Sequence, residues 1–291
     1  MIHQGILRYG GARYLWWALA LIVASSMLYL TQRAGTQPSG STWQGYVLGT
    51  IGALIIVWLA FLGVRKRRYA STIGTVQGWT SAHVYLGMAL LVVATLHSAA
   101  QVGWNVHTLS YVLMWIVVLS GMVGIQGYLV IPRLLARNRE AGARAEMFAE
   151  LVELDRQVRS LTARCTPAIA AAITSGVERT VIGGGVIAQL FGRDHSVFVS
   201  AEKGALASNA DQQPLVDLIA HRIPRVEKTA EAATLHEAVV ILCRRQAVLR
   251  RIRRDIKLQG WLTVWLHVHV PLTIALLVAL VVHIVTTFVY W

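Results

Sequence analysis

Residues 261–291 have the sequence WLTVWLHVHVPLTIALLVALVVHIVTTFVYW, which contains no Asp, Glu, Lys or Arg. A run of this length can cross a bilayer core, because about 20 helical residues suffice. His269 and His283 are 14 residues apart in it. At about 100° per residue they share one helix face, and at about 1.5 Å rise they lie roughly 21 Å apart along the axis. The stretch therefore predicts a membrane-spanning helix with one histidine toward each end of the same face.

An earlier apolar run, residues 80–102, repeats this spacing, since His83 and His97 are also 14 residues apart. Histidine is rare and costly inside a bilayer, so a histidine in a membrane span is a functional candidate by default. Two equal spacings on two predicted helices favour a shared role for the four side chains.

The composition of the whole chain indicates a membrane protein. Of its 291 residues, 55% are hydrophobic, which is more than a soluble domain usually carries. Five apolar runs are long enough to span a membrane, namely 14–31, 44–64, 80–102, 108–131 and 262–288. In the fourth run, glycines at every third position (Gly121, Gly124 and Gly127) predict close helix packing. Pro132 is expected to end that helix.

The charged residues divide the chain into three segments. All 14 acidic residues lie within 133–257, whereas the membrane segments 1–132 and 258–291 have none. Basic clusters at 65–68, 133–139 and 250–257 flank the predicted spans. By the positive-inside rule we expect the N-terminus and the 133–257 insert in the cytoplasm, and the C-terminus in the periplasm of a bacterial-type inner membrane. The same clusters account for the net charge of +13 without a nucleic-acid partner.

This topology makes the third and fifth spans parallel, so the depths of their histidines match. His83 and His269 are expected near the cytoplasmic side, and His97 and His283 toward the outer side. Each opposed pair offers two axial nitrogens to one haem iron, so the sequence predicts two stacked bis-histidine haem b sites. Gly87, one turn after His83, fits either the close approach of a flat macrocycle or ordinary helix packing.

Two further histidines flank the predicted sites. His267 lies roughly 160° away from the face of His283, and Pro271 predicts that the helix bends or starts nearby. His107 precedes the fourth span on its outer side. Each is a candidate contact for a haem propionate or a quinone, with a solvated interfacial role as the alternative.

The insert is expected to be a small α+β domain. An amphipathic helix with a coiled-coil-like seam is predicted by Met147, Leu151, Leu154, Val158 and Leu161. A second helix is expected over 229–257, with one apolar face formed by Leu235, Val239, Leu242 and Leu249. Pairing of these two helices would bury both faces. Short strands are expected at 179–182 and 196–200.

A glycine-rich segment in the insert matches part of a dinucleotide-binding fingerprint. Residues 183–188, GGGVIA, fit G-x-G-x-x-A, and Glu202 lies 19 residues after Gly183. The strand expected before it is short, and no further βαβ unit follows. A glycine turn between a strand and a helix is therefore the favoured interpretation.

Other metal centres fit the sequence less well. Zinc takes three or four ligands around one ion, whereas the histidines of one span are roughly 21 Å apart. Only two cysteines, Cys165 and Cys243, are present, and an iron–sulfur cluster takes four ligands. We expect these cysteines to be reduced and structural.

The predicted spans resemble the membrane di-haem b-type cytochromes in the positions of four histidines, His83, His97, His269 and His283. These include respiratory cytochrome b, the cytochrome b subunits of hydrogenases and formate dehydrogenases, and transmembrane ferric reductases. The likeness is one of histidine spacing and covers spans two to five. The Pro-Glu-Trp-Tyr motif of respiratory cytochrome b is absent, and the flavin and NADPH domain of many ferric reductases does not follow span five.

Together these features predict an all-α membrane protein with five transmembrane helices, four of which form a haem-binding bundle, and an α+β insert between helices four and five. The resemblance implies transmembrane electron transfer by a cytochrome b subunit of a respiratory-type complex. Its partners would be a quinone and a periplasmic c-type cytochrome or iron–sulfur protein. A stand-alone reductase of metal ions and a non-redox scaffold or sensor are the alternatives.

Overall fold

The computed structural model describes residues 5–31, 39–68, 73–139, 142–191, 194–200 and 204–289. Its long helices are α1 (Arg13–Leu30), α2 (Trp43–Arg67), α3 (Val76–Ser98), α4 (Val106–Asn138), α5 (Arg144–Leu161) and α9 (Thr229–Val289). Its shorter α-helices are α6 (Pro167–Glu178), α7 (Val186–Phe191) and α8 (Gln213–Arg222). Single 3₁₀ turns form at Ile6–Arg8, Thr162–Arg164, Ala210–Gln212 and Ile223–Arg225, and the strands are β1 (Val197–Val199) and β2 (Leu206–Ser208).

Five of these helices, α1, α2, α3, α4 and α9, are long and apolar enough to cross a membrane. Each covers all or most of one of the five predicted spans, so the chain is of the helical, multi-pass membrane type. The chain forms two compact units, one of residues 1–126 with 265–291 and one of residues 127–264. We call them the membrane unit and the second unit.

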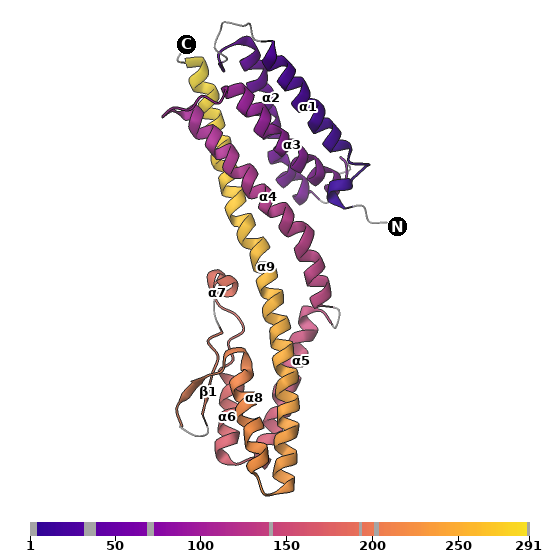
Figure 1. Cartoon of the computed structure of the whole chain (residues 1–291), viewed down its shortest axis with the longest axis vertical. Coiled ribbons are helices and arrows are strands. Elements are labelled where there is room, and N and C mark those ends of the chain that lie inside the picture. Colours follow the sequence, from indigo (N-terminus) through magenta and orange to yellow (C-terminus); the bar gives the residue numbers. More distant parts are fainter. Residues whose placement is uncertain are drawn as a thin grey trace. The chain divides into compact units, whose positions relative to one another are not determined.

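In the membrane unit, segments from four helices share one apolar core (Figure 1). Its buried members are Ile56, Leu90, Leu91, Met114, Leu276 and Leu280. Side-chain caps begin two of these helices: Thr42 Oγ1 accepts from Gly45 N at 3.1 Å, and Thr75 Oγ1 accepts from Gly78 N at 3.0 Å. Each cap satisfies a backbone N–H that has no partner within the first turn.

Two helix ends differ from the sequence prediction. Helix α3 ends at Ser98, short of residue 102, because Ala99 and Ala100 have left-handed φ values of 48° and 57°. Helix α4 was expected to end at Pro132, but it continues to Asn138. A proline removes one backbone hydrogen bond, and the bonds on either side of it carry the helix on.

The predicted insert helix and the fifth span are one helix, α9, which runs for 61 residues. Pro271 lies inside it, so the expectation that a helix starts beside this proline is wrong, and His267 is helical. The stretch between the two predicted helices contains one glycine, Gly260. A single glycine costs a helix only about 1 kcal/mol, which is too little to interrupt it.

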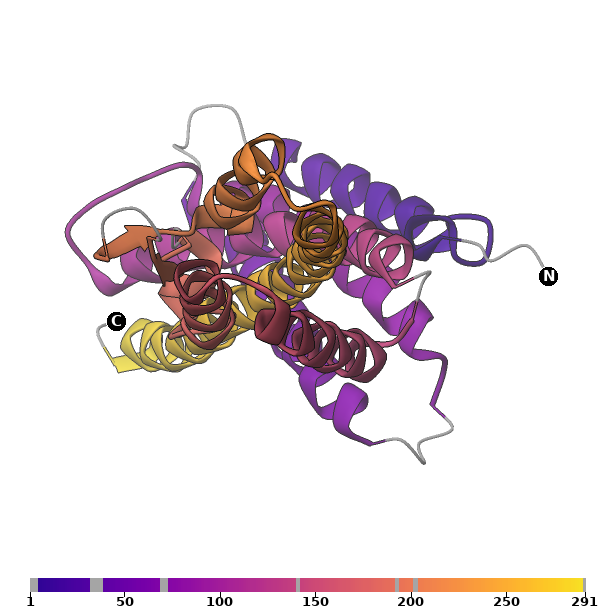
Figure 2. The same ribbon diagram turned by 90° about the horizontal axis from the view of Figure 1, so that it is seen from below.

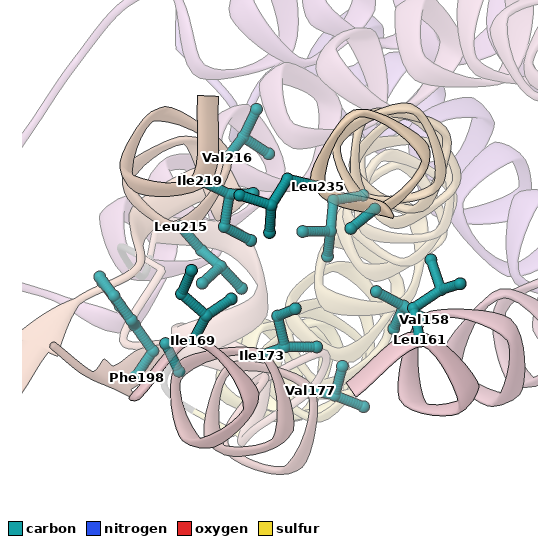
Figure 3. Close-up of a cluster of buried hydrophobic side chains, with 13 residues drawn as sticks. Val158, Leu161, Ile169, Ile173, Val177, Phe198, Leu215, Val216, Ile219 and Leu235 are labelled. Carbon is teal, nitrogen blue, oxygen red and sulfur yellow. The ribbon is translucent and has the colours of Figure 1, made fainter. Parts of the chain in front are cut away.

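The second unit is built from helices α5, α6, α8 and the first part of α9 (Figure 2). Figure 3 shows its main apolar cluster, to which α5, α6, β1, α8 and α9 contribute the labelled side chains. The predicted seam of α5 is buried along its whole length. Near its start Met147 packs in a cluster with Ile252, and near its end Val158 packs in a cluster with Leu235, so α5 and α9 pair in antiparallel fashion.

The strands of this unit differ from those predicted. β1 lies within the predicted 196–200 strand and pairs in antiparallel fashion with β2, with Phe198 opposite Ala207. The strand expected at 179–182 does not form. The backbone of Val181 forms hydrogen bonds with side chains and not with another strand. Val181 N donates to Ser196 Oγ at 2.9 Å, and Val181 O accepts from Arg253 at 2.7 Å.

The glycine-rich segment therefore lacks the setting of a dinucleotide-binding turn. No strand precedes Gly183 in the described part of the chain, and the helix that follows, α7, has six residues. Glu202 lies outside the described residues. The expected turn between a strand and a helix is thus a loop before a short helix.

Within the second unit, ion pairs join Asp255 of α9 to Arg139, which follows α4, and to Arg144 at the start of α5. The carboxylate of Asp255 is fully buried and accepts from Arg139 Nε at 2.6 Å and from Arg144 Nε at 2.7 Å. Burial raises the pKa of Asp255, but the hydrogen bonds from the two guanidinium groups outweigh it, so the pKa lies below its usual value.

Candidate functional site

A cavity of about 70 Å³ lies in the membrane unit among α2, α3, α4 and α9. His83 from α3 and His269 from α9 both line it. Its other lining residues are apolar except for Thr273, and they include Gly87 and Gly121. We call His83 and His269 the first histidine pair, and His97 and His283 the second histidine pair.

The imidazole of His83 is held in one tautomer by the backbone of α2. Its Nδ1 lies 3.1 Å from the carbonyl oxygen of Leu59. A carbonyl can only accept, so Nδ1 carries the proton and donates it. Nε2 of His83 is then left with an unshared electron pair, which is the form that binds a metal.

The imidazole of His269 is held by α4 in the same way. Its Nδ1 lies 2.7 Å from Ser120 Oγ, and Ser120 Oγ donates its own proton to Val117 O at 2.8 Å. Ser120 is therefore the acceptor of the His269 proton, and Nε2 again keeps an electron pair. Trp265 stacks on the His269 ring at 5.1 Å and 24°, and its Nε1 donates to Ser120 O at 2.7 Å.

In the second pair, His97 donates from Nδ1 to the carbonyl of Gly45 at 2.8 Å. Gly49, one turn further along α2, lies against the same ring, where an added Cβ would be 2.7 Å from Cε1. The ring centroids of His97 and His283 are 6.0 Å apart with an interplanar angle of 75°. The small residues of α2 thus let this ring lie between the helices.

His283 has another histidine as its Nδ1 partner. His107 Nδ1 lies 2.7 Å from His283 Nδ1, and the two rings meet edge to face with centroids 4.5 Å apart. His107 is exposed at the start of α4. All four paired histidines therefore have a partner at Nδ1.

An apolar layer lies between the two pairs. Leu90 is midway between His83 and His97 on α3, and Leu276 is midway between His269 and His283 on α9. Both leucines are buried in the core that the four helices share. The pairs therefore form two separate levels, roughly 21 Å apart along each helix.

The predicted partners are close in space within each pair, while their binding of haem stays a prediction. His267 is exposed on α9 and is not one of the described residues that line the cavity. In the glycine series of α4, Gly124 lies against Trp265 and Gly127 against Leu262, which is the helix packing expected. Gly121 instead lines the cavity, and a Cβ there would be 3.5 Å from His269 Cε1.

Of the residues that hold the four rings, the sequence singled out only His107, as a candidate propionate or quinone contact and not as a partner of His283. Gly45 and Gly49 form a small-x-x-x-small motif on α2, which indicates a close approach of some neighbour. That motif could have pointed to them. Nothing in the sequence distinguishes Ser120 from other helix serines, because its role depends on how α4 faces α9.

Chemically, each level of the site presents imidazole nitrogens in an apolar setting. Across the described ranges, no three His, Cys, Asp or Glu side chains gather into a site for a bare metal ion. Paired imidazoles are instead suited to a cofactor that brings its own equatorial ligands. Scans against protein-family models, curated proteins and solved structures find no match to the chain.

Proposed function

We propose that the chain carries electrons across a membrane through two bis-histidine haems b, one between His83 and His269 and one between His97 and His283. One observation carries the proposal: at both levels the histidines have a partner at Nδ1. The carbonyl and hydroxyl acceptors of His83, His97 and His269 fix the tautomer that leaves Nε2 for a metal, as is usual for metal-bound histidine. The imidazole of His107 can serve as the same kind of acceptor for His283. Histidines that served only to tie helices together would not need matched levels on two helices.

The residues present fit this cofactor. Two imidazoles that bind one iron, each through a nitrogen about 2 Å from the metal, have ring centroids roughly 6 Å apart. The rings of His97 and His283, at 6.0 Å, match this separation. The cavity of the first pair is smaller than a porphyrin. Binding there requires flexible lining side chains such as Met88 and Met122 to move aside.

The chain's own groups set how the site would work. Haem bound at these positions supplies reversible one-electron iron chemistry. With His83 and His269 holding one haem, and His97 and His283 the other, each group would supply electron transfer rather than oxygen activation. The leucine layer and the apolar lining exclude water, and in this low dielectric a change of charge at one level acts more strongly on the other level than it would in water.

The proposed setting is a bacterial-type inner membrane, with the N-terminus and the second unit in the cytoplasm and the C-terminus in the periplasm. The basic clusters beside the spans support this orientation. The chain would then be the cytochrome b subunit of a complex. It would exchange electrons between the quinone pool and a periplasmic c-type cytochrome or iron–sulfur protein, with the second unit as its assembly or docking module.

The test uses the full chain in sealed liposomes that contain ferricyanide, with ascorbate added outside. We expect the internal ferricyanide to be reduced at a rate that rises with the amount of haem-loaded protein. Liposomes with the His97→Ala variant should lose most of this rate, because the electron path then lacks one level. Equal rates for wild type, variant and protein-free liposomes would contradict the proposal.

A further inference from the structure

The four paired histidines differ in what accepts their Nδ1 proton. His83 and His97 donate to backbone carbonyls, and His269 donates to a hydroxyl. His283 alone among the four faces an imidazole, that of His107, at 2.7 Å. Because the partner of His283 is the side chain of His107, a substitution at residue 107 can remove it without changing the backbone.

Two contacts at the start of α4 hold His107 beside His283. Asn105 Oδ1 accepts from Thr108 N at 2.9 Å and thereby caps the helix. One turn further on, Ser110 Oγ donates to Ala279 O at 3.1 Å, which ties α4 to α9 one turn before His283. The two helices are antiparallel there, so these contacts set the register in which the two rings meet.

We infer that His107 is the positioning residue of the second haem site, an inference that rests on the proposed function. A neutral imidazole has one N–H, so in a contact between two Nδ1 atoms one ring donates and the other accepts. When His283 presents Nε2 to iron, its proton is on Nδ1 and His107 is the acceptor. His107 then carries its own proton on Nε2, the nitrogen that does not face His283.

This contact gives the second site an electronic character of its own. An imidazole nitrogen is a stronger hydrogen-bond acceptor than a neutral carbonyl, so it draws the Nδ1 proton further from His283. The His283 ring becomes a stronger electron donor through Nε2, as carboxylate partners make other metal-bound histidines. A stronger donor favours ferric over ferrous iron. We therefore expect His107 to lower the midpoint potential of the second haem relative to a protein that lacks this imidazole.

The experiment measures the full-length protein in detergent with two variants at one position. His107→Ala removes the acceptor, whereas His107→Asn keeps one, because the Asn side-chain oxygen can occupy the place of the His Nδ1. The readouts are haem content, the two midpoint potentials and the electron paramagnetic resonance spectrum of the ferric haems. The signal lost in His97→Ala identifies the second haem, and His236→Ala, on the exposed surface of the second unit, is the matched histidine control.

We expect His107→Ala to retain two haems, to raise the potential of the second haem alone and to shift its resonance signal, and we expect His107→Asn to restore both largely. Loss of only the second haem in His107→Ala, with retention in His107→Asn, would also support the inference. Unchanged potential and resonance in His107→Ala would overturn it while leaving the two-haem proposal standing. A wild-type protein without haem would overturn both.

Discussion

Ser120 accepts the Nδ1 proton of His269 at 2.7 Å while its own proton is turned to Val117 O. Ser120→Ala therefore removes the acceptor without removing the ligand. We expect the affinity of the first site for haem to fall roughly 10- to 100-fold, the usual effect of losing a partner behind a metal ligand. Haem titration of the purified apoprotein measures this.

Ser110 provides the control for that change, since it lies on the same helix and donates to Ala279 O in α9 rather than meeting a first-pair histidine. Ser110→Ala should leave the first site's affinity within about twofold of wild type. Equal losses in the two variants would mean that the serine hydroxyls hold the helices together and have no specific role toward His269.

The glycines of α2 give a steric test of the second site. A Cβ at Gly49 would lie 2.7 Å from His97 Cε1, so Gly49→Ala must displace this ring. A Cβ at Gly52 would meet Leu90 and Val93 at 3.7 Å and 3.9 Å, which is ordinary contact. We expect Gly49→Ala to lose the second haem, or about 1–3 kcal/mol of stability, and Gly52→Ala to lose neither. Haem content and thermal unfolding of the two glycine variants measure these effects. A Gly49→Ala protein with wild-type values would contradict the placement of His97.

The buried carboxylate of Asp255 predicts how the second unit responds to acid. Its folded-state pKa is lowered, so its contribution to stability is complete above the usual carboxyl pKa of about 4 and is lost as the pH falls through the folded value. Asp255→Asn should cost about 2 kcal/mol at pH 7, because it breaks the bonds to Arg139 and Arg144. Hydrogen exchange of α5 and the adjoining part of α9 would report the loss.

The variant should also change the pH dependence. As the pH falls through the lowered folded-state pKa of Asp255, the wild-type carboxylate becomes protonated, so the difference in stability between wild type and Asp255→Asn should shrink. Glu153→Gln, at an exposed ion pair within α5, is the control and should leave stability nearly unchanged at both pH 7 and pH 3. A difference at Asp255 that stays constant from pH 7 to pH 3 would contradict the role given to its charge.

The long-range pattern of the chain was predictable from its sequence. Apolar runs determine the five membrane-type helices, and the seam from Met147 to Leu161 predicts the buried face of α5. The spacing of His83 and His97 places both on one helix face because helix periodicity is a local property. Because His269 and His283 have the same spacing on α9, the sequence also predicts that the histidines of the two helices lie at matching depths.

The remainder depends on contacts that no local pattern encodes. Pro132 and Pro271 lie inside helices because flanking turns and neighbouring helices outweigh one missing hydrogen bond. β2 has three residues, too few for an alternating pattern to stand out. The partner of His269 is a hydroxyl and that of His283 is an imidazole, and both follow from how α4 lies against α9.

The most direct test of the central claim is the haem content of the purified full chain, measured with a reduced-minus-oxidised spectrum. Wild type is compared with His97→Ala and His269→Ala, each of which removes one ligand of a different pair. The account predicts about two haems b per chain in the wild type, from one axial histidine pair per haem, and about one in each variant. A wild-type chain that binds no haem, or variants that both keep the full content, would contradict it.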